Sequence, residues 1–532
     1  MKQFFLSYYK LHPLRSILII GLLLRLISVF FSIGYAFTDD HYFVIEEAQF
    51  WMDADFGKLP WWKPFITEKD RLPHSLFYTS MHYVLFQFWR ILGLENPEIK
   101  MIFVRLIHAV YSLLIVWYGF KIARIFSNTK LAIQVAWFLA ALWVFPILSV
   151  RNLVEFVCIP PLMAMLYLLI RNEIPKNKEL FYAGLLAGIA FSLRFQTVFI
   201  SFAFGLLSIY YHNLKRASFI GIGFFLCVIL LQGGIDYLFW GIPFHELTGY
   251  FQYNLEHSHE YPNGPWYNYI LLMIGLVLVP IGLFMAYGLV KNAKKYIWFT
   301  LPIMLFLIFH SSFPNKQERF ILPIIPFFIL GGWLSWKDEY NATEVNSKLR
   351  KIHKNGLIFF AILNTILLII VSPASTRTGK IGVMNYLREK QVKHFAMEST
   401  HKENIEYMPR FYWGVWNHPE QIVPICQAEC FYDTVKILKK PLPQYIVFSD
   451  SNHLKNRVEE ARKQLKNLTF EYEVKPSFLD RSLTRLNPRI NSQSFYIYKA
   501  EYPEGFYLLP RTTGTTAVES TTATKATPTR IP

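Results

Sequence analysis

Long apolar runs separated by short basic segments make up most of the chain before residue 375. Windows of about 20 residues with almost no charge are typical of transmembrane helices, because a helix of that length crosses the hydrocarbon core of a bilayer. The pattern therefore predicts a polytopic α-helical membrane protein. Eleven spans are expected, at residues 17–37, 101–121, 131–149, 153–170, 180–193, 196–211, 217–234, 267–290, 296–311, 320–336 and 356–372.

The segments between these runs predict the orientation of the chain. Lys and Arg gather in KIARIFSNTK, RNEIPKNKE, HNLKR, KNAKK and SKLRKIHKNG. Positive residues mark cytosolic loops, so we expect the N-terminus inside and the chain after residue 373 outside. A further apolar stretch at 75–93 would invert all of these loops if it crossed the membrane. We therefore expect it to be an amphipathic helix at the outer interface, within an external loop over residues 38–100.

The segment 180–211 is mostly apolar and too long for one crossing, and the sequence SLRFQT interrupts it. Basic segments flank both ends, so we expect a hairpin of two short helices whose tip presents Arg194 and Gln196 at the outer face. An arginine in contact with lipid is costly. Arg194 is therefore expected to face a cavity or to pair with an acid, for which Glu155 is the candidate.

The chain changes character after residue 375. Helical patterns (NYLREKQ and LKNRVEEARKQL) alternate with short β-rich runs (QYIVFSD and FYIYKAE), which predicts a small external α/β domain over residues 376–505. Residues 506–532 are rich in Thr without a periodic apolar face and are expected to be disordered. Residues 1–375 then form the multi-pass transmembrane domain, with a second external loop at 236–265.

Composition and charge refine this picture. The chain has 532 residues and a formal net charge of +17, which on a soluble protein would suggest a nucleic-acid partner. The basic residues follow the positive-inside distribution instead, so no nucleic-acid partner is expected. Cys158 and Cys227 lie in expected spans as small core residues. Cys426 and Cys430 lie in the external domain, where an oxidising compartment can pair them, although a spacing of four residues on a helix is awkward for a disulfide.

The unusual polar groups of the apolar part fall on the expected outer side. The first span is followed directly by four acids, Asp39, Asp40, Glu46 and Glu47. Acids at the carboxyl end of a helix oppose its dipole, so a catalytic role explains them better than a solvated helix end. Residues 236–265 contain no Lys or Arg, while NKQERF (315–320) brings two cations beside an apolar helix. This arrangement favours a reaction in which one group takes a proton and another holds a phosphate.

Four motifs resemble those of the membrane mannosyltransferases that build glycolipid anchors and lipid-linked oligosaccharides (glycosyltransferase family 22, GT-C superfamily). DDHYFVIEEA resembles the first-loop signature of that family, and NKQERFILPIIPF resembles a second signature followed by a Pro-containing helix. IDYLFWGIPF…YFQYN…GPWYNY is similar to its long middle loop, and SVRNLVE to the stretch after its third span. The resemblance runs, with gaps, from about residue 16 to residue 336.

The chain departs from the family pattern at several positions. Thr38, Asp39 and His41 stand where the family usually has His, Pro and Glu, and Asn315 and Gln317 stand where His and Glu are usual. The retained positions are Asp40, Glu47, Lys316, Glu318, Arg319 and Phe320. The general activity is therefore better supported than the identity of the sugar or the acceptor.

The resemblance implies a GT-C fold and an inverting transfer of a sugar, by resemblance mannose, from a polyprenyl or dolichyl monophosphate. The acceptor is a hydroxyl of a glycolipid or lipid-linked glycan. No cofactor is implied, and the spacing of His245, His257 and His259 is no known ligand pattern, so no metal is expected. The expected partners are the lipid-phosphate sugar, the glycolipid acceptor and membrane lipid. The active site is expected on the non-cytosolic side of a multi-pass protein, with the bacterial inner membrane slightly favoured over the endoplasmic reticulum.

The motifs also assign roles to residues. Asp40 is the expected base, with Asp39 as its rival, and Glu47 orients the acceptor or the base. The candidates for the donor phosphate are Arg194, Lys316 and Arg319, of which the last two have interfacial anchoring as their structural alternative. The other substrate-binding candidates are His41, Arg151, Gln196, Asp236, Tyr253, Asn254, Trp266, Tyr267 and Glu318. Trp266 fits an aromatic belt at the membrane surface even better than a substrate pocket.

Two other functions stay open. A lipid or glycolipid transporter without transferase chemistry would carry charges at the bilayer midplane, whereas the charges here gather on one side, and no internal repeat is evident. A membrane anchor that only displays the external domain would tolerate neutralisation of Asp40. The clustering of charges and motifs favours the transferase over both.

Overall fold

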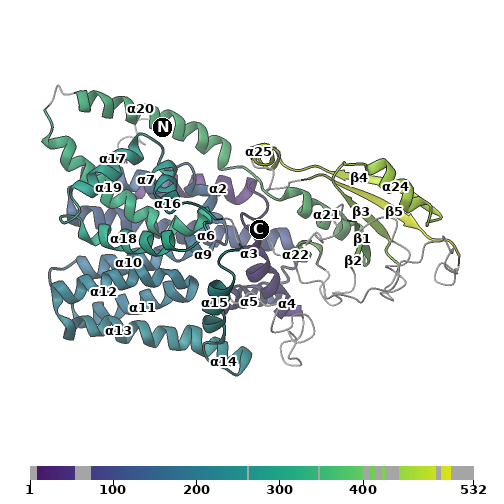
Figure 1. Cartoon of the computed structure of the whole chain (residues 1–532), viewed down its shortest axis with the longest axis horizontal. Helices are drawn as coiled ribbons and strands as arrows, with labels where there is room; N and C mark the ends of the chain where they lie inside the picture. Colours follow the sequence, from purple (N-terminus) through teal and green to yellow (C-terminus); the bar gives the residue numbers. More distant parts are fainter. Residues whose placement is uncertain are drawn as a thin grey trace.

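The structure is a computed structural model that describes residues 9–53, 74–260, 263–344, 348–398, 408–414, 422–425, 442–486 and 493–504. Figure 1 shows a body of packed helices that adjoins, at one end, a smaller part built around a sheet. Cys426, Cys430 and the Thr-rich segment 506–532 lie outside the described residues.

The first expected span is shorter than predicted, and helices replace much of the loop after it. Helix α2 (Pro13–Phe31) ends before the predicted bound, and two arginines from distant parts of the chain bind the carbonyl groups that follow it. Arg105 Nη1 lies 2.9 Å from the Ser32 oxygen, and Arg151 donates to the Gly34 oxygen. The chain continues in α3 (Thr38–Asp40), the π-helix η1 (His41–Glu46), α4 (Glu47–Asp53) and α5 (Leu76–Ile91).

Helix α5 is the amphipathic helix that the sequence predicts. Its inner face, with Tyr78, His82 and Phe86, is buried, whereas Val84 and Phe88 on the other face are exposed. Such an apolar outer face suits a helix that lies against lipid.

The second expected span is one continuous helix, whereas the third and fourth, at 131–149 and 153–170, are each broken into two helices. After α6 (Pro97–Phe126) come α7 (Thr129–Ala141), α8 (Phe145–Val150), α9 (Val154–Val157) and α10 (Ile159–Ile170). At the first break the Asn364 side chain accepts from the Trp143 N–H and donates to the Ala141 carbonyl, each at 2.8 Å. The second break precedes Pro160 and Pro161, which lack the N–H that continues a helix. This break leaves Glu155 on the short helix α9.

The predicted hairpin at 180–211 is present, as α11 (Asn177–Leu193) and α12 (Val198–His212) with the 3-10 turn η2 (Phe195–Thr197) at its tip. Helix α13 (Leu214–Val228) packs closely on α11. A Cβ on Gly184 would lie 2.0 Å from the Ile220 carbonyl oxygen, and a Cβ on Gly223 would lie 2.2 Å from the Phe181 oxygen. Small residues permit this close approach of membrane helices.

The segment 236–265, expected as a loop, is largely helical. The π-helix η3 (Ile229–Gly234) extends α13 into α14 (Ile235–Trp240), and α15 (His245–Glu256) follows. The polar groups of this segment bind one another, since Gln232 Nε2 donates to both Asp236 oxygens at 2.8 and 2.9 Å, and the Glu246 N–H donates to Asp236 at 3.1 Å. These internal hydrogen bonds let polar sequence fold as packed helices.

The expected span at 267–290 is bent, because α16 (Asn268–Leu276) and α17 (Ile281–Lys291) meet at 119°. Leu278 has a left-handed backbone (φ +65°) and Pro280 has no N–H, so the helical hydrogen bonds stop between the two helices. The chain then forms α18 (Ile297–Ser312), the 3-10 helix η4 (Glu318–Ile324), α19 (Ile325–Ala342) and α20 (Lys348–Val371).

Six helices among the described residues are long and apolar enough to cross a membrane, or seven if the bent pair α16 and α17 counts as one span. The unit of η4 and α19 is central, with 94% of its apolar window buried, whereas α20 runs along the outside of the helical body with 6% buried. An apolar helix without protein cover is suited to lipid. The multi-pass membrane class is therefore confirmed, while the number of eleven crossings stays a prediction.

The C-terminal part has the predicted α/β character. Its five described strands pair in the order β2-β1-β3-β5-β4. Strands β1 and β2 are parallel, as are β1 and β3, while β5 runs antiparallel to both β3 and β4. The strands are β1 (Phe395–Glu398), β2 (Ile422–Ile425), β3 (Tyr445–Ser449), β4 (Asn467–Val474) and β5 (Phe495–Glu501), and the helices are α21 (Thr378–Glu389), α22 (Arg410–Trp413), α24 (Leu454–Arg462) and α25 (Phe478–Leu486).

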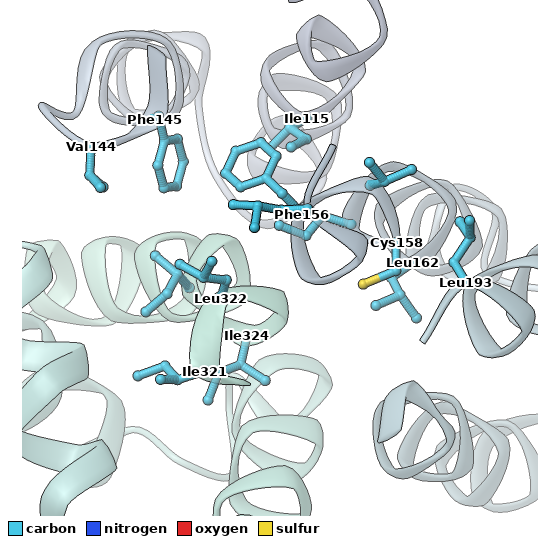
Figure 2. Close-up of a cluster of buried hydrophobic side chains, with 14 of the residues drawn as sticks. Ile115, Val144, Phe145, Phe156, Cys158, Leu162, Leu193, Ile321, Leu322 and Ile324 are labelled. Atoms are coloured by element: carbon cyan, nitrogen blue, oxygen red, sulfur yellow. The ribbon is translucent and has the colours of Figure 1, made fainter. Parts of the chain in front are cut away.

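A buried apolar cluster holds α9 against η4. Figure 2 shows Phe156 of α9, Phe145 of α8 and Leu322 of η4 in one cluster of apolar side chains. The rings of Phe145 and Phe156 meet edge to face with centroids 5.6 Å apart. Glu155 and Arg319 neighbour these core residues in the chain, so the packing of this cluster brings the two charged side chains together.

Candidate active site

Arg319 lies at the centre of a cluster of carboxylates. Its Nη1 lies 2.9 Å from Asp40 Oδ2, its Nη2 binds Asp39, and its Nε lies 3.0 Å from Gln317 Oε1 and 3.5 Å from Glu155 Oε1. One planar guanidinium thus contacts two acids from α3 and one from α9, an arrangement that the fork of N–H donors in arginine allows. The cluster joins residues 279 positions apart in the chain.

Glu155 connects this cluster to a second arginine. Its Oε1 lies 3.2 Å from Arg194 Nη2, so the predicted ion pair between the two residues is present. Glu155 is fully buried between the two guanidinium groups. With Asp39, Asp40 and Glu155 opposed by Arg194 and Arg319, the five side chains carry one net negative charge when all are ionised.

The two neighbouring aspartates differ in environment. The side chain of Asp40 is 6% exposed and that of Asp39 is 42% exposed. Asp40 also accepts the Val154 N–H at 3.4 Å, and the Asn152 amide donates to its backbone oxygen. Burial, followed by repulsion from Glu155, raises the pKa of Asp40 to about 7 despite the attraction of Arg319. A carboxyl with such a pKa exchanges protons near neutral pH, as a general base requires.

Aromatic rings border the arginines. The Arg319 guanidinium carbon lies 4.9 Å from the centre of the Phe37 ring, and that of Arg194 lies 4.8 Å from the centre of the Phe320 ring. These faces attract the cations and exclude water, which strengthens the charge interactions around Asp40.

A pocket adjoins the Arg194 side of the cluster. Its volume is about 390 Å³ including the open mouth, and its wall contains Arg194, Gln196, Tyr78 and Tyr250. Gln196 donates to the Tyr250 hydroxyl, while its Oε1 is buried without a hydrogen bond. A largely apolar wall with a few polar groups is typical of a small-molecule binding site.

Lys316 lies three residues before Arg319, but its ammonium group binds backbone carbonyls and none of the carboxylates of the cluster. Its Nζ donates to the carbonyl oxygens of His310 at 2.7 Å, Ser311 at 3.0 Å and Phe313. These carbonyls stand at the end of α18, where helical partners are missing. Burial lowers the pKa of Lys316. In this conformation all three donors of the ammonium group are engaged, so Lys316 holds the end of α18.

Three candidates from the first-loop and third-span motifs have internal partners instead of facing the cluster. His41 is buried, with Nε2 3.1 Å from Glu46 Oε1. Arg151 binds the carbonyl groups after α2 and the Ser32 hydroxyl. Glu47 accepts from Trp51 Nε1 at 3.3 Å along α4.

The middle-segment candidates do not converge on Arg319. Asp236 is buried in the hydrogen bonds that join η3 to α15, and Asn254 donates to the Tyr250 carbonyl of its own helix at 2.8 Å. The other three lie at the surface or partly so: Trp266 and Tyr267 are exposed and pack on each other, and the Tyr253 ring contacts His257. Glu318, from the second signature, is exposed at the start of η4.

The sequence motifs did not assign Glu155 or Gln317 a role in the site. The signal for Glu155 was its position as an acid at the edge of an apolar run, where a charge is costly without a partner. Gln317, which departs from the family pattern, accepts the Arg319 Nε hydrogen bond.

Comparisons with known proteins agree with the fold and the motifs. Residues 16–418 match the sequence profile of the Alg9-like mannosyltransferase family. GPI mannosyltransferase 3 from Debaryomyces hansenii is 25% identical over 166 residues, which cover 31% of this chain and 29% of that protein. The chain therefore aligns with less than a third of the length of this relative.

Solved structures with a similar fold include ArnT from Cupriavidus metallidurans in the apo state, with a TM-score of 0.58, 12% identity, and coverage of 90% of this chain and 97% of that chain. ArnT bound to undecaprenyl phosphate gives a TM-score of 0.57 at 11% identity, with the same coverage. The apo oligosaccharyltransferase from Archaeoglobus fulgidus gives 0.50 at 12% identity, over 87% of this chain and 74% of that chain.

These likenesses confirm the predicted GT-C fold, and the family match covers more than half of the chain and supports the predicted glycosyltransferase. The chain belongs to the Alg9-like mannosyltransferase family.

Proposed function

We propose that this protein is an inverting glycosyltransferase that moves mannose from a polyprenyl or dolichyl monophosphate to a hydroxyl of a glycolipid or lipid-linked glycan, on the non-cytosolic face of its membrane. The observation that carries the proposal is the buried Asp40 carboxylate bound to Arg319, beside the pair of Glu155 and Arg194. The family supports the sugar, and the undecaprenyl phosphate held by ArnT supports a lipid-phosphate donor.

The reaction requires a base that accepts the proton of the attacking hydroxyl, and a leaving group, here the phosphate, that takes up negative charge. Asp40 accepts the proton of the acceptor hydroxyl while that oxygen attacks the anomeric carbon from the face opposite the phosphate. The bond between the anomeric carbon and the phosphate oxygen breaks, and the phosphate leaves with the electron pair. A single displacement of this kind inverts the configuration at the anomeric carbon.

Arg319 links these two events. While Asp40 is ionised, its carboxylate holds one side of the guanidinium at 2.9 Å. When Asp40 takes the proton, that ion pair weakens at the moment the departing phosphate gains its second charge. Arg319 and Arg194 then stabilise the phosphate, since charge-assisted hydrogen bonds to guanidinium groups are strong. Asp39, the more exposed aspartate, keeps Arg319 oriented during this exchange.

The test is transfer from synthetic polyprenyl-phosphate mannose to a total glycolipid extract by the purified protein in nanodiscs. We expect wild type to consume the donor and Asp40→Asn to lose at least about 100-fold in rate, because general-base catalysis contributes about 10²–10⁴-fold. Donor binding by Asp40→Asn is expected to persist. Wild-type rates in Asp40→Asn would rule out the assigned base, and no consumption by wild type would remove the donor assignment.

A further inference from the structure

A short helix of the C-terminal part contacts the segment that carries Asp40. Figure 1 places α22 at the junction, close to α3. The Phe411 N–H of α22 donates to Glu46 Oε1 at 2.9 Å, although the two residues lie 365 positions apart. The same oxygen lies 3.1 Å from His41 Nε2. Glu46 therefore ties both ends of η1 to α22.

Ring stacking reinforces this contact. The His41 ring stacks on Tyr35 with centroids 4.5 Å apart and on Tyr412 of α22 with centroids 5.6 Å apart. Phe411 stacks on Phe86 of α5 at 5.7 Å. All of these side chains are buried, so the contact is part of the core and excludes water.

We propose that α22 is a brace that positions the catalytic base: through Glu46 and the stacked His41 ring it fixes the turn in which Asp40 stands. His41 follows Asp40 directly and opens the π-helix η1. A π-turn is rare and often occurs at functional sites, and it needs support from neighbouring contacts. The inference rests on the proposed function, because it assigns positioning residues for the same base.

Because η1 directly follows Asp40, we expect the brace also to limit the access of water to this carboxyl. The groups that face this carboxyl are Asp39 on its own helix, Glu155 and the Val154 N–H of α9, Arg319 of η4, and Tyr78 of α5. Loosening α22 changes none of these charges. It lets η1 shift, which misplaces Asp40 relative to Arg319 and admits solvent, and solvation favours the ionised carboxylate.

The experiment compares Tyr412→Leu, which removes the stacked ring, with Tyr412→Phe, which keeps it. Asn385→Ala is the matched control, because Asn385 of α21 donates to Glu98 of α6 at 2.6 Å and thus joins the same two parts away from Asp40. Transfer from polyprenyl-phosphate mannose is measured in nanodiscs over donor concentration and over pH 5–9. Thermal unfolding reports whether each variant folds.

For Tyr412→Leu we expect kcat to fall about tenfold with the donor KM within about twofold, because a small misplacement of a catalytic group slows chemistry without changing donor contacts. The acid limb of its pH profile should move about one unit to lower pH as Asp40 becomes solvated. Tyr412→Phe should restore both values, and Asn385→Ala should match wild type. If Tyr412→Leu does not fold, Glu46→Gln, which weakens both bonds to Glu46 Oε1, should give the same direction of change.

The brace would be overturned if a folded Tyr412→Leu or Glu46→Gln variant kept the wild-type kcat and pH profile. It would also be overturned if Tyr412→Phe lost as much kcat as Tyr412→Leu, or if Asn385→Ala did. Failure of the brace and failure of the proposed reaction give different results. No transfer by wild type, or full activity of Asp40→Asn, contradicts the proposed reaction, whereas active wild type, inactive Asp40→Asn and unchanged Tyr412→Leu contradict the brace alone.

Discussion

Replacing Glu155 with Gln removes one negative charge beside Asp40 and keeps the size of the side chain. The two acids share Arg319, with Asp40 Oδ2 2.9 Å from Nη1 and Glu155 Oε1 3.5 Å from Nε. The two nitrogens of one guanidinium are separated by two C–N bonds of about 1.33 Å, so the carboxylate oxygens are at most about 9 Å apart.

This limit gives the size of the effect. At this greatest separation, two like charges repel by about 1.8 kcal/mol at an effective dielectric constant of about 20, so the effect is at least about 1.4 pKa units. Glu155 raises the pKa of Asp40, so its loss lowers that pKa from about 7. A base works in its ionised form, and the acid limb of activity should therefore move to lower pH by at least about 1.4 units.

The assay is the pH dependence of kcat/KM, with each variant normalised to its own alkaline plateau. At pH 6 we expect Glu155→Gln to retain at least about eight times the plateau fraction of wild type, from the two titration curves. Glu459→Gln, an exposed acid on α24, is the control for charge loss and should give the wild-type profile. An unchanged acid limb, or a shift to higher pH, would refute the reasoning, because then Asp40 is not the titrating base or does not sense Glu155.

Two further predictions test the fold around the site. Lys316→Met should destabilise the protein by about 1–3 kcal/mol, seen as a lower thermal midpoint, because buried carbonyls of α18 lose their hydrogen-bond donor. The affinity for the lipid-phosphate sugar should change less in this variant than in Arg194→Gln. The reverse order would make Lys316 a phosphate ligand. Gly184→Ala should sharply reduce the yield of folded protein, because the new methyl group meets the Ile220 oxygen at 2.0 Å. Gly221→Ala, with open space around it, is the control and should express normally. Equal yields of the two variants would contradict the contact between α11 and α13.

Local pattern was enough to find the apolar segments. The hairpin at Arg194, the helix at 76–91 and the alternation of helices and strands after residue 376 all appear in the structure. They were predictable because hydrophobic runs, periodicity and basic loops are properties of neighbouring residues. The breaks near Leu142, Cys158 and Leu278 were missed, because windows of average hydropathy do not register a single turn or a distant side chain such as Asn364.

The sequence by itself determined the membrane class, the family motifs and the acids and arginines available to a site. Only the tertiary structure decided their partners. Glu155 and Arg319 meet because α9 and η4 pack on one apolar cluster, and Asp40 of α3 binds the same guanidinium. Lys316 turns instead to α18, and His41 turns to Glu46 and α22. The physical reason is that a charge in a dry interior must take whichever partner the packing brings within about 3 Å, and that choice depends on the whole fold.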